Sequence, residues 1–219
     1  MAHPEDVVEA PLLGARATFL KTTEQTNGEL LRVEVVRPPG FSVSEHVHPI
    51  QEERHYVVRG TLRARVGRQE RDYEEGEVAV GPPGVPHTWG NPNDSEALCL
   101  VSEHRPALHT EEMLEGAFTI ARDLQSDKRG ALEHVLRMTV LVDDIKDDFY
   151  ISRASIQALL RLFAALGPLG RLLGYEQVYS QGQRGVSHKV VEGIVLGTLL
   201  SFLLPTLFLL RRRKRLRAS

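Results

Sequence analysis

Between residues 17 and 105, apolar and polar positions alternate in short runs. Runs such as LLRVEVV, RHYVVRG and TLRARVG are rich in Val, Leu and Thr. In TLRARVG, Leu62 and Ala64 fall on one face of an extended strand and Arg63 falls on the other. Turn signals of the Asn-Gly, Pro-Pro-Gly and Asn-Pro kinds separate the runs. Short strands at this spacing predict an antiparallel β-barrel or sandwich.

After this region the apolar pattern changes to a helical period. Apolar residues recur at three- and four-residue intervals over residues 106–175, with breaks at DKRG and DDIKDD. The last segment, 156–175, is apolar around most of its circumference and mildly polar along one narrow stripe. Three partners could bury that apolar surface: the barrel, a second subunit of a homodimer, or the membrane interface. The predicted fold class is therefore mainly β, an antiparallel barrel or sandwich followed by C-terminal α-helices.

The C-terminal part predicts a membrane anchor. Residues 193–210 carry no charge and are followed at once by RRRKRLR. At ~1.5 Å per residue such a helix spans roughly 27 Å, close to the ~30 Å hydrocarbon thickness of a bilayer. We predict a transmembrane helix over 190–210 and a basic tail over 211–219. A linker over 176–189 precedes them, and an N-terminal segment over 1–16 precedes the barrel.

The membrane topology has several solutions. The basic tail belongs in the cytoplasm by the positive-inside rule, and nothing before the barrel reads as a secretory signal. The last helix is a tail anchor, one half of a hairpin with 156–175, or a partly inserted segment. We favour a cytoplasmic barrel held at the membrane.

Composition narrows the functional classes. Of 219 residues 42% are hydrophobic, which is enough for a substantial core. The 27 basic and 29 acidic side chains give a net charge of −2, so no overall field attracts nucleic acid. The single cysteine, Cys99, excludes an intramolecular disulfide framework and a cysteine-rich zinc site. The chemistry must therefore come from a local group of side chains.

Three histidines and one glutamate form such a group. His46 and His48 lie two residues apart and so share one face of a strand. Glu53 begins the next strand after a short turn, and His87 comes from a second block rich in proline and glycine. Imidazole and carboxylate ligands suit one divalent transition metal ion (Fe, Mn, Ni, Zn, Co or Cu) and suit Ca or Mg poorly. Such a set leaves coordination positions open for water, O₂ or substrate.

The two blocks resemble the two motifs of the cupin superfamily, in its single-domain cupin type 2 branch. The matching residues are Gly40, His46, His48, Glu53 and Gly60 in the first block and Gly76, Pro82, Gly84, His87 and Asn91 in the second. The resemblance covers about residues 17–105. It implies a β-barrel of the jelly-roll type with the metal ion bound by His46, His48, Glu53 and His87.

Strand alternation identifies the neighbours of the predicted ion. Glu52 points away from Glu53, and the six-residue interval to Gly60 favours Glu53 as the ligand. His55 falls on the face of Glu53, as a hydrogen-bonding neighbour of the ligands or a catalytic acid or base. Trp89 shares a face with His87 and is a candidate wall for binding a substrate. The remaining histidines, His104 among them, show no ligand spacing.

Two functions remain open. The first is a membrane-tethered, metal-dependent cupin enzyme, resembling a dioxygenase or an isomerase, on a small and apolar or aromatic substrate. The alternative is a non-enzymatic sensor or binding module for a small molecule or metal at the membrane. The barrel itself does not choose between them. An enzyme requires His55 and Trp89 to line an accessible cavity beside the ion.

Overall fold

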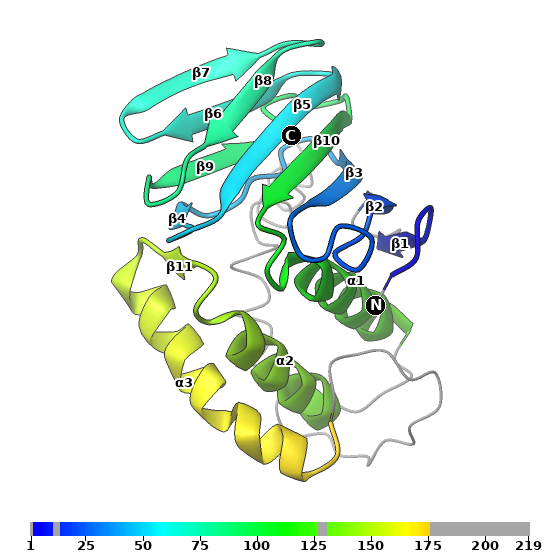
Figure 1. The fold of residues 1–219 in the computed structure, drawn as a ribbon, viewed down its shortest axis with the longest axis vertical. Helices are drawn as coiled ribbons and strands as arrows, with labels where there is room; N and C mark the ends of the chain where they lie inside the picture. Colours follow the sequence, from blue (N-terminus) through cyan, green and yellow to red (C-terminus); the bar gives the residue numbers. More distant parts are fainter. Residues whose placement is uncertain (1, 11–13, 127–130, 176–219) are drawn as a thin grey trace, which may run out of the picture.

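The barrel consists of two antiparallel sheets. The computed structural model describes residues 2–10, 14–126 and 131–175, and Figure 1 shows its strands gathered above its helices. One sheet has the order β1-β2-β3-β10-β5-β8 and the other the order β11-β4-β9-β6-β7. The strands are β1 (Val7–Ala10), β2 (Ala15–Lys21), β3 (Leu31–Arg37), β4 (His46–Val47), β5 (Glu52–Arg59), β6 (Leu62–Val66), β7 (Gln69–Tyr73), β8 (Val78–Gly81), β9 (His87–Gly90), β10 (Leu98–Arg105) and β11 (Tyr150–Ile151).

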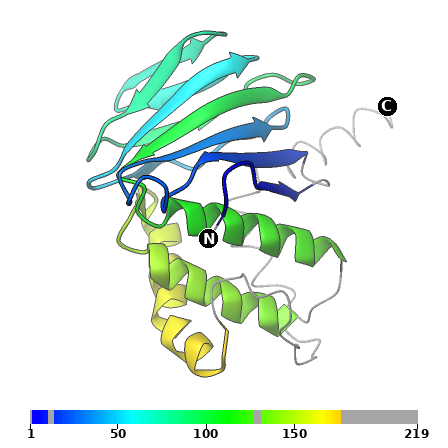
Figure 2. The same ribbon diagram turned by 45° about the vertical axis from the view of Figure 1, so that its right-hand side comes forward.

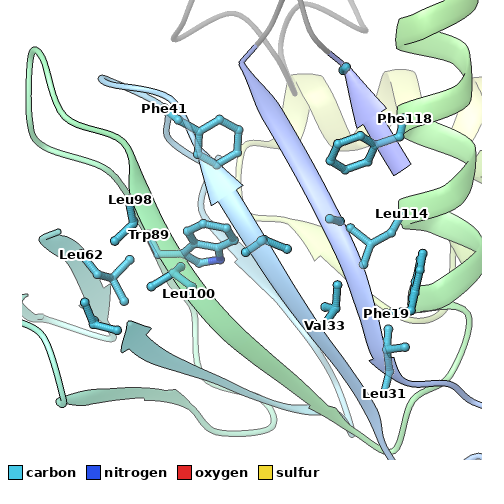
Figure 3. Packing of buried hydrophobic residues seen from close by; sticks show 14 of the residues in the cluster. Phe19, Leu31, Val33, Phe41, Leu62, Trp89, Leu98, Leu100, Leu114 and Phe118 are labelled. Atoms are coloured by element: carbon cyan, nitrogen blue, oxygen red, sulfur yellow. The ribbon is translucent and has the colours of Figure 1, made fainter. Parts of the chain in front are cut away.

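Alternation along the strands builds the core between the sheets. In β3, every second residue is buried, from Leu31 through Val33 and onward. Leu62 from β6 and Leu100 from β10 have no exposed surface and belong to the same cluster. Figure 3 shows these side chains with the aromatic rings that continue the cluster toward the helices. The predicted fold class, mainly β with helices after it, is confirmed.

Three helices lie against one side of the barrel (Figure 2). They are α1 (Thr110–Ser126), α2 (Ala131–Ile145) and α3 (Ala154–Leu172). Helix α1 contacts β1 and brings Leu114 and Phe118 into the barrel's core cluster. Helix α2 packs between α1 and α3. The helices therefore extend the apolar interior of the barrel.

Helix α3 packs mainly against α2, a cover that was not among the three alternatives for segment 156–175. Two glycines allow the close approach. A Cβ at Gly167 would lie 2.4 Å from the Cβ of Asp143, and one at Gly170 would lie 2.7 Å from a methyl of Val140. Leucines on the other side of the helix are largely exposed: Leu162, Leu166, Leu169 and Leu172.

No helix in the described ranges combines the length and apolarity needed to cross a bilayer. The predicted transmembrane helix over 190–210, its linker and its basic tail lie outside the described residues.

The chain returns from the helices to the barrel through β11. This short strand pairs with β4, with Tyr150 opposite Val47 and Ile151 opposite His46. The helical region thereby adds a strand to the barrel beside one of the predicted metal ligands.

Candidate metal centre

The four predicted ligands lie together inside the barrel. The ligand atoms of His46, His48, Glu53 and His87 are all within 4.8 Å of one another, and each residue is at most 6% exposed. Strand pairing explains the convergence, because β4 pairs with β9 and sets His46 opposite His87. Four side chains separated by up to 41 positions in the sequence thus form one group that could hold an ion.

Each histidine of the group is oriented by a backbone carbonyl. The carbonyl oxygens are those of Ser44, 2.9 Å from Nδ1 of His46, of Asp148, 3.1 Å from Nδ1 of His48, and of Val85, 2.8 Å from Nδ1 of His87. A carbonyl only accepts hydrogen bonds, so each Nδ1 carries the proton and donates it. In the neutral form of each ring, Nε2 then carries the lone pair with which histidine binds a metal.

Glu53 uses its two oxygens differently. Oε2 lies 3.1 Å from Nε2 of His87 and 3.7 Å from Nε2 of His46. Oε1 lies 3.2 Å from Nε2 of His55 and 3.9 Å from Nδ1 of His104. Burial acts to raise the pKa of Glu53, but attraction to His55 and hydrogen bonds to the surrounding histidines hold it well below its usual range. The carboxylate is therefore ionised and joins the ligand group to a second pair of histidines.

Burial also separates the histidines by their pKa values. It lowers the pKa of His48 to about 3 and that of His104 to about 4, against the attraction of Glu53. Burial acts in the same direction on His87, but the hydrogen bond and charge of Glu53 outweigh it and raise the pKa of His87. At neutral pH, His48 and His104 are therefore neutral, and protons compete with a metal more readily at His87.

His55 and Trp89 occupy the places that alternation predicted. Nδ1 of His55 lies 2.8 Å from the hydroxyl of Ser102, and the ring centroids of His55 and Trp89 are 4.4 Å apart. Both residues line a cavity of about 250 Å³ that reaches from the ligand group to the helices. Most of its wall is apolar, with contributions from Phe41, Leu114, Phe118, Met138, Leu141 and Phe149.

Two residues that the sequence analysis left outside the metal site, Glu52 and His104, lie differently in the structure. Glu52 points away from the group and accepts a 2.6 Å hydrogen bond from Arg54. His104 lies beside Glu53, although its spacing suggested no role, because β10 pairs with β5 and sets the two residues opposite each other. Strand alternation was the available signal, since His104 follows the inward-facing Ser102 by two residues.

Phe149 is a part of the site that the sequence did not indicate. It precedes β11, and its ring centroid lies 6.1 Å from that of His46 and 5.8 Å from that of His48. The helical region therefore supplies both an aromatic cover and, through the Asp148 carbonyl, the orientation of one histidine.

The donor set fits a divalent transition metal. Three imidazole Nε2 atoms and one carboxylate oxygen are the ligand types that such ions prefer. The set reaches four protein ligands and leaves room for one or two further ligands on an ion of higher coordination number.

Comparison with known proteins finds a cupin domain in part of the chain. Residues 33–103 match the family model Cupin_2, described as "Cupin domain". Protein SchB of Streptomyces halstedii is 34% identical over 82 residues, which are 37% of this chain and 59% of that protein. The chain thus spans less than two thirds of this curated relative's length.

Two solved structures are similar in part. An RmlC-like cupin from Shewanella frigidimarina is 21% identical, with 49% of this chain and 88% of that chain covered and a TM-score of 0.42. KdgF from a Halomonas species is 19% identical, with 42% of this chain and 79% of that chain covered and a TM-score of 0.37. The family match and the two-sheet fold support the cupin superfamily for this part of the chain.

Proposed function

We propose that the chain is a metal-dependent cupin enzyme that acts on a small, apolar or aromatic molecule. Its metal ligands are His46, His48, Glu53 and His87. The observation that carries this proposal is the convergence of the four ligand atoms within 4.8 Å of one another, with three Nδ1 atoms held by backbone carbonyls so that Nε2 is the nitrogen left to bind an ion. Histidines that bind metals are commonly held in this way.

The surrounding residues have distinct roles in this proposal. A bound ion supplies a Lewis acid and open coordination positions, which suit the chemistry of a dioxygenase or an isomerase. His55 is fixed between Oε1 of Glu53 and the Ser102 hydroxyl, and can hold or transfer a proton beside the ligand group. Trp89 forms a flat apolar wall next to His55. The helices cover the cavity and limit the access of water.

The cavity favours an enzyme over the alternative, a non-enzymatic sensor of a small molecule or metal. His55 and Trp89 line the same space as three of the ligands, so a substrate beside the ion would reach both. The sensor keeps one supporting observation, the contact between His48 and the carbonyl of Asp148, which links the ligand group to the helical region.

Metal analysis and a substrate screen test the proposal. We expect one ion per chain in protein isolated from its native source, and loss of that ion in His48→Ala. We then expect O₂ consumption or isomerisation with small aromatic substrates, and His55→Gln to lose turnover while keeping the ion. Protein without stoichiometric metal refutes the proposal. If the protein holds the metal and binds aromatic molecules but converts none of those tested, the result favours the sensor.

We also propose that residues 190–210 hold this barrel at the cytoplasmic face of a membrane. The charge-free run and the basic residues after it support the proposal. Cell fractionation of the full chain and of a variant lacking 190–219 tests it. We expect the full chain in the carbonate-resistant membrane pellet and the shortened chain in the supernatant. Equal distribution of the two proteins contradicts it.

A further inference from the structure

Arg37 is a buried cation without a partner among the described residues. It ends β3, is 9% exposed and lines the cavity. Its Cζ lies 4.8 Å from the ring centroid of Phe41, 5.7 Å from that of Phe118 and 5.8 Å from that of Trp89. Within the part of the chain that the structure describes, no carboxylate lies within ion-pair distance of the guanidinium, and Nε has no hydrogen-bond partner. The group is therefore enclosed by aromatic faces.

Such an arrangement is costly for a folded protein. A buried charge is normally paired, because losing its water is not offset by apolar contacts. Cation–π contacts recover only a part of that cost. Burial lowers the pKa of Arg37 to about 10, against the attraction of Glu53, so the side chain remains charged at neutral pH. The protein thus keeps a full positive charge inside an apolar cavity.

Glu53 does not serve as the missing partner. Its oxygens are occupied by His87 and His46 on one side and by His55 on the other. A divalent ion in the ligand group would outweigh its single negative charge. The other charged residues described along the cavity wall are cations, Lys146 and Arg161, the first of them paired with Asp143. With a divalent ion bound, the described charged groups along the cavity wall would therefore be positive on balance.

We propose that Arg37 binds the carboxylate of the substrate, so that the substrate is an acid with an apolar or aromatic body. This inference rests on the proposed function and names its substrate class. One guanidinium matches one carboxylate, which it can bind through two parallel hydrogen bonds. The aromatic faces around Arg37 accept the body of the molecule.

The position of Trp89, close to both Arg37 and His55, determines how the bound acid is oriented. The indole contacts both polar groups: its ring lies 5.8 Å from Cζ of Arg37 and 4.4 Å from the ring of His55. His55 in turn lies 3.2 Å from Glu53. An acid held at Arg37 therefore extends along the indole toward His55 and the ion.

The single tryptophan makes the inference measurable, because all tryptophan fluorescence of the chain comes from Trp89. Full-length, metal-loaded protein is titrated with phenylacetate, 1-naphthylacetate and octanoate, and with the amide of each, at constant ionic strength. We expect at least one acid to bind saturably and about 10-fold or more tightly than its amide. Arg37→Met should weaken that acid about 30-fold or more, as for a buried charge pair that loses one partner. If no acid binds more tightly than its amide, the inference is overturned.

Three variants separate the role of Arg37 from a general effect of charge. Arg161→Met removes an exposed cation from the same cavity and should leave acid binding within about 2-fold. Arg37→Lys keeps the charge without the planar fork and should fall between the parent and Arg37→Met. The metal-free Arg37→Met protein should unfold at a temperature no lower than the parent, because replacing an unpaired buried charge with an apolar side chain is often stabilising. If Arg37→Met does not fold, the Lys variant and the amide comparison decide.

Metal content measured on the same samples separates this inference from the proposed function. Acid binding that depends on Arg37 in protein without metal affinity supports the inference and refutes the metal enzyme. Metal-loaded protein whose preference for acids survives Arg37→Met refutes the inference and leaves the metal enzyme standing, since the acid then binds the ion directly.

Discussion

The two walls of the cavity differ in chemistry and in construction. The barrel wall carries the predicted metal ligands, His55 and Arg37, which strand pairing places except for His48, which directly follows β4. The wall from α1 and the C-terminal half of α2 is mostly apolar, with Leu114 and Phe118 of α1 among its members. A hydrogen-bonded ladder fixes atoms closely enough for coordination, whereas packed helices mainly set the volume and dryness of a space. Chemistry and shape therefore rest on separate elements, and mutations should be able to separate them.

Among the barrel-wall substitutions, His87→Ala should have the largest effect on metal affinity. Loss of one direct ligand should weaken metal binding at least about 1,000-fold, because partners outside the ligand shell alone are worth about 10- to 100-fold. The metal-free protein should lose some stability as well, because the Val85 carbonyl and Glu53 each lose a hydrogen-bond partner. Titration with Zn²⁺ against a chelator and calorimetry measure the two quantities. His3→Ala, at an exposed position, is the matched control. Stoichiometric metal in His87→Ala contradicts the prediction.

Phe118→Ala should lower stability and leave metal affinity nearly unchanged. We expect a loss of about 2–3 kcal/mol in the free energy of unfolding, at or below the usual range for Phe→Ala because part of the ring already borders the cavity. Metal affinity should stay within about 3-fold, since α1 supplies none of the four predicted ligands. Urea unfolding of the metal-free protein measures the loss, and Leu132→Ala, at a 41% exposed position, is its control. A parallel fall in metal affinity would show that the walls are coupled.

Arg171→Met should have the smallest effect on the free energy of unfolding. It tests how much the contact between α3 and α2 contributes to stability. Arg171 binds Asp143 and Asp144 and so ties α3 to α2, but it is 41% exposed. We expect a loss of about 0.2–1 kcal/mol near neutral pH. Arg153→Met, at the start of the same helix and without a capping bond, should change less.

The pH dependence of that loss follows from Asp143. Burial acts to raise the pKa of its carboxyl, but hydrogen bonds from Arg171 and Lys146 lower it below its ordinary value. A depressed pKa in the folded state stabilises the protein above the ordinary carboxyl range, and this contribution disappears as the pH falls through the folded value. The difference between parent and Arg171→Met should therefore vanish in acid. Urea unfolding at about pH 7 and about pH 3 tests this, and an undiminished difference contradicts it.

The barrel and its inward-facing residues could be predicted because strand alternation is a local rule. It separated Glu53 from Glu52 and placed His55 and Trp89 on the inner face. Arg37 also continues the buried alternation of β3, but the sequence analysis gave it no role. A charged residue at the end of a strand is usually solvated, so only the three-dimensional structure shows that this one is enclosed.

The helical side of the site could not be predicted in this way. Phe149 and the Asp148 carbonyl reach the ligand group from about 100 positions away in the sequence, and no spacing records that contact. The packing of α3 on α2 depends on Gly167 and Gly170, which in the sequence resemble weak points of a helix. Long-range contacts of this kind depend on the whole fold.

Strand β11 has a consequence for how the barrel can be moved between proteins. The segment that matches the cupin family model ends at residue 103, yet the strand beside His46 and the carbonyl behind His48 come from residues 148–151. A graft or truncation drawn at the family boundary would carry all four ligands and leave part of their support behind. The smallest transplantable unit of this candidate metal centre therefore includes α1, α2 and β11.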